Sequence, residues 1–170
     1  MQKAKRLFIV ALFSSIIFVI NFFVPPPISY LLLVVQAVIL ALSTFFLGKA
    51  GATYIGFIGG FLSMLSRPAF GPFTFLFTFL FGFLVDVFSF ALKVCSMTEG
   101  VNRNRVMVAM AFSTAIIGFL SYYTTAVYLQ IINLDSIMMG LVIFVATGSG
   151  ISAGYAAAYL WNKYLRNISI

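Results

Sequence analysis

The sequence of 170 residues has no histidine, a single cysteine (Cys95) and only three acidic residues. Without histidine it lacks the commonest proton shuttle and metal ligand. One cysteine allows neither an internal disulfide nor a cysteine cluster for a metal. Charged residues make up 8% of the chain, whereas about 25% is typical of soluble domains. These absences exclude an ordinary soluble domain and argue against haem, copper or zinc chemistry, so no metal or cofactor is predicted.

Catalytic signatures are also scarce. Three acidic residues leave few candidates for general acid–base chemistry, so we expect no enzyme, and an intramembrane enzyme is only a weak alternative. The chain has no phosphate-binding loop of the form GxxxxGK[ST]. If transport here is driven by ATP, a separate polypeptide must supply the ATPase.

What the sequence does have is apolar residues, at 63% of the total. A membrane-spanning helix needs roughly 20 of them in a row. The apolar runs predict an all-α membrane protein with six transmembrane helices in one domain over residues 1–170. The expected spans cover about residues 7–24, 28–47, 50–66, 73–92, 106–132 and 137–161. Phenylalanine occupies every second position from Phe73 to Phe83, a period that is typical of a β-strand. A lone strand cannot satisfy its backbone hydrogen bonds in lipid, so we expect a helix there too.

The basic residues indicate how these spans are oriented. Six spans put nine of the ten Lys and Arg residues on the side of both termini: Lys3, Lys5, Arg6, Lys49, Lys93, Arg103, Arg105, Lys163 and Arg166. Arg67 alone falls on the other side. By the positive-inside rule both termini are cytoplasmic, in a multi-pass protein of the cell membrane. These basic residues flank apolar runs and form no separate patch, so no nucleic-acid partner is expected.

Asp86 is the only ionisable residue inside an expected span. A carboxylate at membrane depth is costly unless it is paired or solvated, so it is a candidate functional residue. Two interpretations are open. Asp86 contacts a ligand or carries a proton, or it is a buried polar tie that accepts hydrogen bonds from neighbours such as Ser89, Ser113 or Ser152.

A substrate that enters from outside meets the outer halves of the spans first. Polar and aromatic side chains there suit a small, partly apolar ligand. For any single one of them an interfacial position is the simpler explanation, except for Arg67, which as a lone outside arginine suits a gate or an anion contact better. Together with Asp86, the predicted substrate-binding residues are Asn21, Gln36, Arg67, Thr74, Thr78, Tyr122, Tyr123 and Tyr128. On the first span, Ala11 and Ser15 are four residues apart, share a helix face and allow close approach of a neighbouring helix.

The stretch from Gly48 to Phe90, about a quarter of the chain, resembles a known family. It contains Lys49-Ala50-Gly51-Ala52, the turn 67–72 (RPAFGP), Gly82 ten residues after Pro72, and an acid at position 86. With six short spans, this pattern is similar to the substrate-binding S component of energy-coupling-factor (ECF) vitamin transporters, in the thiamin-precursor (hydroxymethylpyrimidine) branch. That branch has carboxylates in its third span, whereas residues 50–66 contain none, and Asp86 is shorter than the glutamate there. Both a cationic thiamin-like ligand and a neutral ring compound are therefore open.

The resemblance implies a function and a set of partners. The protein would be the membrane subunit that captures a small vitamin-like heterocycle for import. Its partners would be a transmembrane T subunit, docked on the face of Ala11 and Ser15, and ATPases, all within the lipid bilayer. The alternative is a non-catalytic accessory subunit of a larger respiratory or cell-envelope complex, in which Asp86 is structural.

Overall fold

The computed structural model describes residues 2–23, 29–66, 71–94, 100–128, 130 and 135–165. The described chain forms helices joined by turns and contains no strand, which confirms the all-α prediction. The helices are α1 (Gln2–Phe23), α2 (Ser29–Leu47), α3 (Gly51–Ser66), α4 (Gly71–Ala91), α5 (Arg103–Tyr123) and α6 (Ser136–Leu160). A wider π-helical turn follows each of the last two: η1 (Thr124–Tyr128) after α5 and η2 (Trp161–Leu165) after α6.

These helices begin and end close to the six predicted spans, with differences at the termini. α1 begins five residues before the predicted residue 7 and includes the basic N-terminal segment. α5 begins at Arg103, before the predicted residue 106, because the Asn102 side chain caps it by accepting a hydrogen bond from the Asn104 amide at 3.1 Å. The phenylalanine-rich segment is helical, as α4, in agreement with the argument from lipid.

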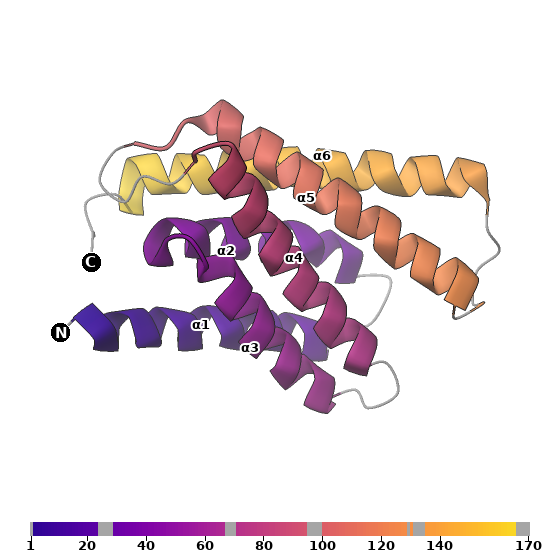
Figure 1. Ribbon diagram of the computed structural model, residues 1–170, viewed down its shortest axis with the longest axis horizontal. Helices are drawn as coiled ribbons and strands as arrows, with labels where there is room; N and C mark the ends of the chain where they lie inside the picture. Colours follow the sequence, from indigo (N-terminus) through magenta and orange to yellow (C-terminus); the bar gives the residue numbers. More distant parts are fainter. Residues whose placement is uncertain are drawn as a thin grey trace.

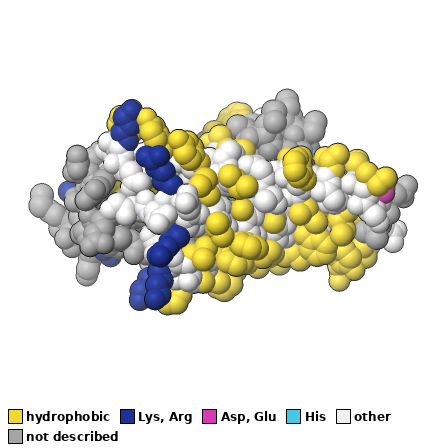
Figure 2. Space-filling model, turned by 90° about the horizontal axis from the view of Figure 1, so that it is seen from above, with side chains coloured by type: hydrophobic (Ala, Val, Ile, Leu, Met, Phe, Trp, Pro, Cys, Tyr) yellow, Lys and Arg dark blue, Asp and Glu magenta, His cyan; other side chains and the backbone are white. Residues whose placement is uncertain are grey.

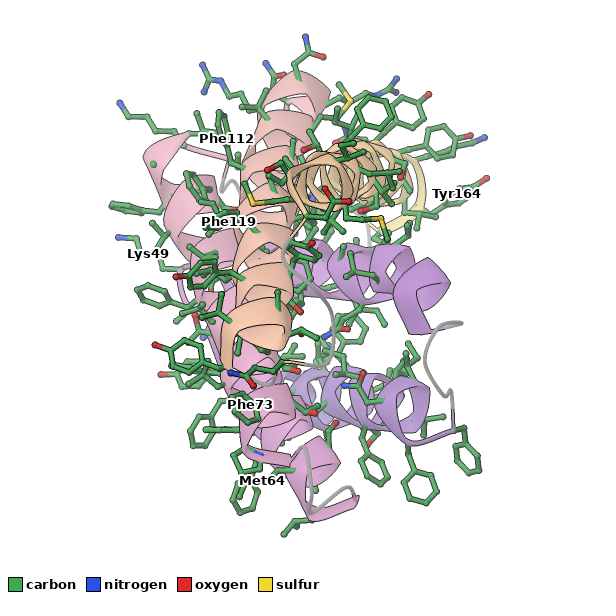
Figure 3. The ribbon with its side chains drawn as sticks, turned by 90° about the vertical axis from the view of Figure 1, so that its right-hand side faces the viewer. Lys49, Met64, Phe73, Phe112, Phe119 and Tyr164 are labelled. Carbon is green, nitrogen blue, oxygen red and sulfur yellow. The ribbon has the colours of Figure 1, made fainter. Side chains whose placement is uncertain are left out.

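Four of the described helical segments are long and apolar enough to cross a membrane: Ala4–Phe23, Gly71–Ala91, Arg103–Tyr128 and Ser136–Leu165. α2 and α3 are also apolar but supply shorter segments, Leu33–Leu47 and Gly51–Leu65. Large apolar side chains are exposed on the outer surface, and Figure 3 labels Phe112 and Phe119 projecting from α5. The chain is therefore a helical membrane protein, because soluble proteins rarely expose so large an apolar surface to water.

Figure 1 shows α1, α2 and α6 running along the long axis of the molecule, while α3, α4 and α5 cross it obliquely. The start of α1 and the end of η2 lie at the same end. Exposed lysine and arginine side chains gather at that end in Figure 2, and an acidic side chain is visible at the opposite end. We call the first of these the basic end; its described members are Lys5, Arg6, Lys49, Lys93, Arg103, Arg105 and Lys163.

Small residues allow the helices to pack closely in pairs. Within α3, Gly56 approaches the backbone of Thr78 and of Gly82 on α4, and Gly60, its partner in a GxxxG pattern, lies against Phe75 and Thr78. α6 packs on α5 in the same way, where Gly154 lies against the Met107 backbone. Close pairing of α3 with α4 and of α5 with α6 leaves room between the pairs, and that room holds the candidate site.

Candidate functional site

A cavity of about 430 Å³ lies between α2, α4, α5 and α6. Its volume falls within the range of small-molecule sites. Most of its wall is apolar: Leu33, Phe77, Phe81, Ile117, Met138, Leu141, Val142, Val145 and Ala146. The polar side chains in the wall are all neutral: Gln36, Thr78, Ser121, Tyr122, Thr125 and Ser149. Apolar walls with a few polar groups are typical of a site that binds a small organic molecule.

α5 and the turn η1 supply five of the sixteen residues in this wall, the first of them Ile117. Gly118, Ser121, Tyr122 and Thr125 follow the spacing i, i+3, i+4 and i+7, which places them on one side of a helix. Thr125 already belongs to the π-helical turn η1. Such turns are often found at functional sites, because the extra residue changes the direction of the side chains.

Most of the polar groups in the wall are held in place by the backbone. The hydroxyls of Thr78, Thr125 and Ser149 donate to the carbonyls of Thr74, Ser121 and Ala146 at 2.7, 2.8 and 2.7 Å. In the described part of the chain, no hydrogen bond engages the Gln36 amide group or the Ser121 hydroxyl. These two side chains are therefore the polar groups with capacity left for a ligand.

Tyr122 anchors the end of the cavity that lies away from the basic end. Its hydroxyl accepts a hydrogen bond from the Asp135 amide at 3.1 Å and donates to the Asp135 carbonyl at 3.2 Å. The Asp135 carboxylate accepts from the Ile137 amide at 3.0 Å and so caps α6. This arrangement fixes the start of α6, which carries Met138 and Leu141 of the wall.

Asp86 lies outside the cavity. It follows Phe81, the last wall residue on α4, by five residues, which is about 7.5 Å at 1.5 Å per residue, toward the basic end. Its side chain is 6% exposed. The carboxylate accepts from the backbone amides of Ala52 and Thr53 at 3.2 and 2.7 Å, and from the hydroxyls of Thr44 and Thr53 at 3.0 and 2.6 Å.

This geometry gives Asp86 a structural role at the N-terminus of α3. Backbone amides at a helix N-terminus have no partner within the helix, and α3 has no acidic residue of its own in the first turn. Asp86 serves as the cap of α3 from a neighbouring helix, with a negative charge at the positive end of the helix dipole. The geometry agrees with the second interpretation of Asp86, a buried tie, although its partners are not Ser89, Ser113 or Ser152.

Two glycines of the family-like stretch, Gly51 and Gly82, lie at the same junction. A methyl group added at Gly82 would overlap the Ala52 carbonyl oxygen, so only glycine fits where α4 crosses the start of α3. Gly51 lies equally close to the Ser43 carbonyl of α2. Gly51, Ala52, Gly82 and Asp86 of that stretch therefore form a packing junction of α2, α3 and α4 that is separate from the cavity.

Of the predicted substrate-binding residues, the cavity brings together Gln36, Thr78 and Tyr122. Asn21 instead donates to the Ser63 hydroxyl at 3.2 Å and ties α1 to α3. Thr74 is half-buried one turn before Thr78 and contributes its carbonyl to that residue. Arg67 lies outside the described residues.

Two predicted tyrosines point elsewhere. Tyr123 is 42% exposed and stacks on Phe119 with ring centres 6.1 Å apart. Tyr128 is 75% exposed at the end of η1. Neither tyrosine lines the cavity, because the face of α5 that does so ends at Tyr122, and Tyr123 is turned one residue further around the helix axis.

The predicted docking residues lie on the free side of α1. Ala11 and Ser15 are both exposed, and the Ser15 hydroxyl donates to the Ala11 carbonyl at 2.7 Å. The opposite side of α1 packs on α3, where Ile17 contacts Gly59. The pair is thus accessible to lipid or to another helix.

Sequence reasoning did not select Ser121, Thr125 or Ser149 for the site. The i, i+3, i+4, i+7 spacing on α5 was the available signal for the first two. Ser149 gave no signal, because α6 contains small residues on all sides.

Comparisons with protein-family models, with curated proteins and with solved structures found no match. Within the described residues, no group of three or more His, Cys, Asp or Glu side chains is placed to hold a metal ion. The chemistry of the cavity wall is therefore the basis for a functional proposal.

Proposed function

We propose that the protein is the substrate-binding membrane subunit of an importer of the ECF type, and that the cavity between α2, α4, α5 and α6 captures its small-molecule substrate. The single observation that carries this proposal is a cavity of about 430 Å³, apolar in most of its wall, with unpaired polar groups at Gln36 and Ser121. Packing alone does not account for an amide that lines a cavity inside a membrane bundle without a protein hydrogen bond, since unpaired polar groups are costly there.

The proposed topology is six membrane crossings with both termini in the cytoplasm of the cell. The basic end, where α1 begins and η2 ends, supports this orientation by the positive-inside rule. The cavity then lies toward the outside, since Tyr122 in its wall binds Asp135 at the opposite end. A subunit that captures a substrate for import needs its site accessible from outside.

Partners follow from what the chain does not supply. It has no nucleotide-binding loop, so ATPases would come from other polypeptides, through a membrane subunit of the T type. The free side of α1 with Ala11 and Ser15 is the proposed contact with that subunit, because small residues permit close helix approach in lipid. The protein itself performs no catalysis in this proposal.

Mass spectrometry of small molecules that co-purify with the detergent-extracted protein tests the proposal. We expect the wild type to retain a heterocyclic compound and Ser121→Phe, which fills the cavity, to lose it. Ser152→Phe is the matched control, because Ser152 is exposed on α6 and does not line the cavity. A reproducible set of partner chains with no small molecule would contradict capture and favour the accessory-subunit alternative.

A further inference from the structure

We infer that the cavity takes an uncharged ring compound with an amide-like edge, in which a ring or carboxamide N–H lies beside a C=O, and that Gln36 is its polar anchor. This inference rests on the proposed function, because it names the class of substrate for the same site. It follows from three features of the cavity wall: its charge, the free amide and the apolar faces around it.

The first feature is the neutral wall. No Asp, Glu, Lys or Arg is among the described residues that line the cavity. Asp86, the ionisable group buried in the described bundle, is engaged by four donors at the start of α3. A cation or anion in the cavity would lose its hydration without gaining a counter-charge, which is strongly unfavourable in a medium of low polarity.

The second feature is the free amide of Gln36. A carboxamide group offers two N–H donors and one C=O acceptor in a plane. It therefore pairs with a group that presents a C=O and an N–H side by side, through two parallel hydrogen bonds. The other polar groups of the wall are committed to backbone partners, except the Ser121 hydroxyl, which can add one further hydrogen bond.

The third feature is the aromatic and aliphatic surface beside Gln36. Phe77 and Phe81 come from α4, four residues apart and so on one helix face, and Ile117 of α5 lines the same cavity. Flat ring compounds bury their faces well on such surfaces. An amide edge fixed by Gln36 would leave the ring faces against these apolar groups.

Equilibrium dialysis with a defined set of water-soluble compounds tests the inference. The set holds nicotinamide (neutral), nicotinate (anionic) and 1-methylnicotinamide (cationic), which share one ring frame. Riboflavin (neutral, with an amide-like edge), pyridoxine (neutral, without one), thiamin (cationic) and biotin (anionic) extend it in size and chemistry. Purified wild-type protein, Gln36→Leu and the control Gln130→Leu are compared; Gln130 is exposed and does not line the cavity.

We expect wild type and Gln130→Leu to retain nicotinamide or riboflavin at least tenfold above every charged compound, and above pyridoxine. Gln36→Leu should lower that retention about tenfold or more, since two hydrogen bonds are lost. Retention of a charged compound equal to that of the neutral ones, or retention that survives Gln36→Leu, overturns the inference but leaves the capture function standing. A preference for the anion nicotinate would also overturn it and would favour Arg67 as the residue that binds the ligand. Retention of no compound contradicts the capture function, and the inference falls with it.

Discussion

Replacing Asp86 is the sharpest perturbation of the architecture. Its carboxylate caps α3 from a neighbouring helix, so its removal should loosen the junction of α2, α3 and α4. The cavity should be unaffected, since its nearest wall residue on α4, Phe81, lies five residues or about 7.5 Å away along the helix. We predict that Asp86→Ala destabilises the protein more than Asp86→Asn, and that both retain the small molecule well below their melting temperatures.

The magnitude follows from the donors left unpaired. Asp86→Ala leaves the buried amides of Ala52 and Thr53 without acceptors, at about 1–3 kcal/mol each. Because the structure around the two amides can relax in part, we expect the free energy of unfolding to fall by about 2–5 kcal/mol in total. For a chain of this size, that loss lowers the melting temperature by about 5–15 °C. Asp86→Asn keeps one acceptor oxygen but turns an NH₂ group toward a donor, so about half that loss is expected.

Thermal unfolding in detergent, followed by circular dichroism, measures these losses. Asp135→Asn is the matched control, because Asp135 caps its own helix at an exposed position and asparagine caps as well as aspartate. A double-mutant cycle with Thr53→Val should show coupling of about 1 kcal/mol or more between Asp86 and the Thr53 hydroxyl. Melting temperatures unchanged in both Asp86 variants, or a well-folded Asp86→Asn protein that no longer retains the small molecule, would refute this reasoning.

Three further predictions concern topology, docking and packing. Reporter fusions at both ends should give cytoplasmic signals, and an external signal from either end would overturn the six-span topology. The double change Ala11→Leu and Ser15→Leu should impair assembly with a partner subunit while the melting temperature changes little, because both sites are exposed; intact co-purification would show that this face contacts lipid only. Gly82→Ala should destabilise the fold by about 1–3 kcal/mol, because its methyl group would overlap the Ala52 carbonyl oxygen, whereas Gly148→Ala, with open space around it, should be neutral or slightly stabilising.

The helices could be predicted from the sequence because each apolar run must satisfy its backbone within itself in lipid. Run lengths and the Pro and Gly residues between them locate the connections to within a few residues. The glycine pair Gly56 and Gly60 likewise predicted close packing of α3, since few other reasons place glycines four apart in an apolar helix.

The site was only partly predictable, for a physical reason. Polarity near the outer end selected Gln36, Thr78 and Tyr122 but also Tyr123 and Tyr128, because composition does not reveal which way a side chain faces. Asp86 stood out as an isolated charge, yet its partners include backbone amides 33 and 34 residues earlier in the chain. Backbone donors carry no sequence signal, so only the three-dimensional arrangement identifies the cap.

An experimental structure of the protein purified with its retained small molecule tests the central claim most directly. The account predicts density for that molecule between α2, α4, α5 and α6, within hydrogen-bonding distance of the Gln36 amide group and clear of Asp86. Density at the junction of α3 and α4 beside Asp86, or a cavity filled by side chains in the loaded protein, would contradict it.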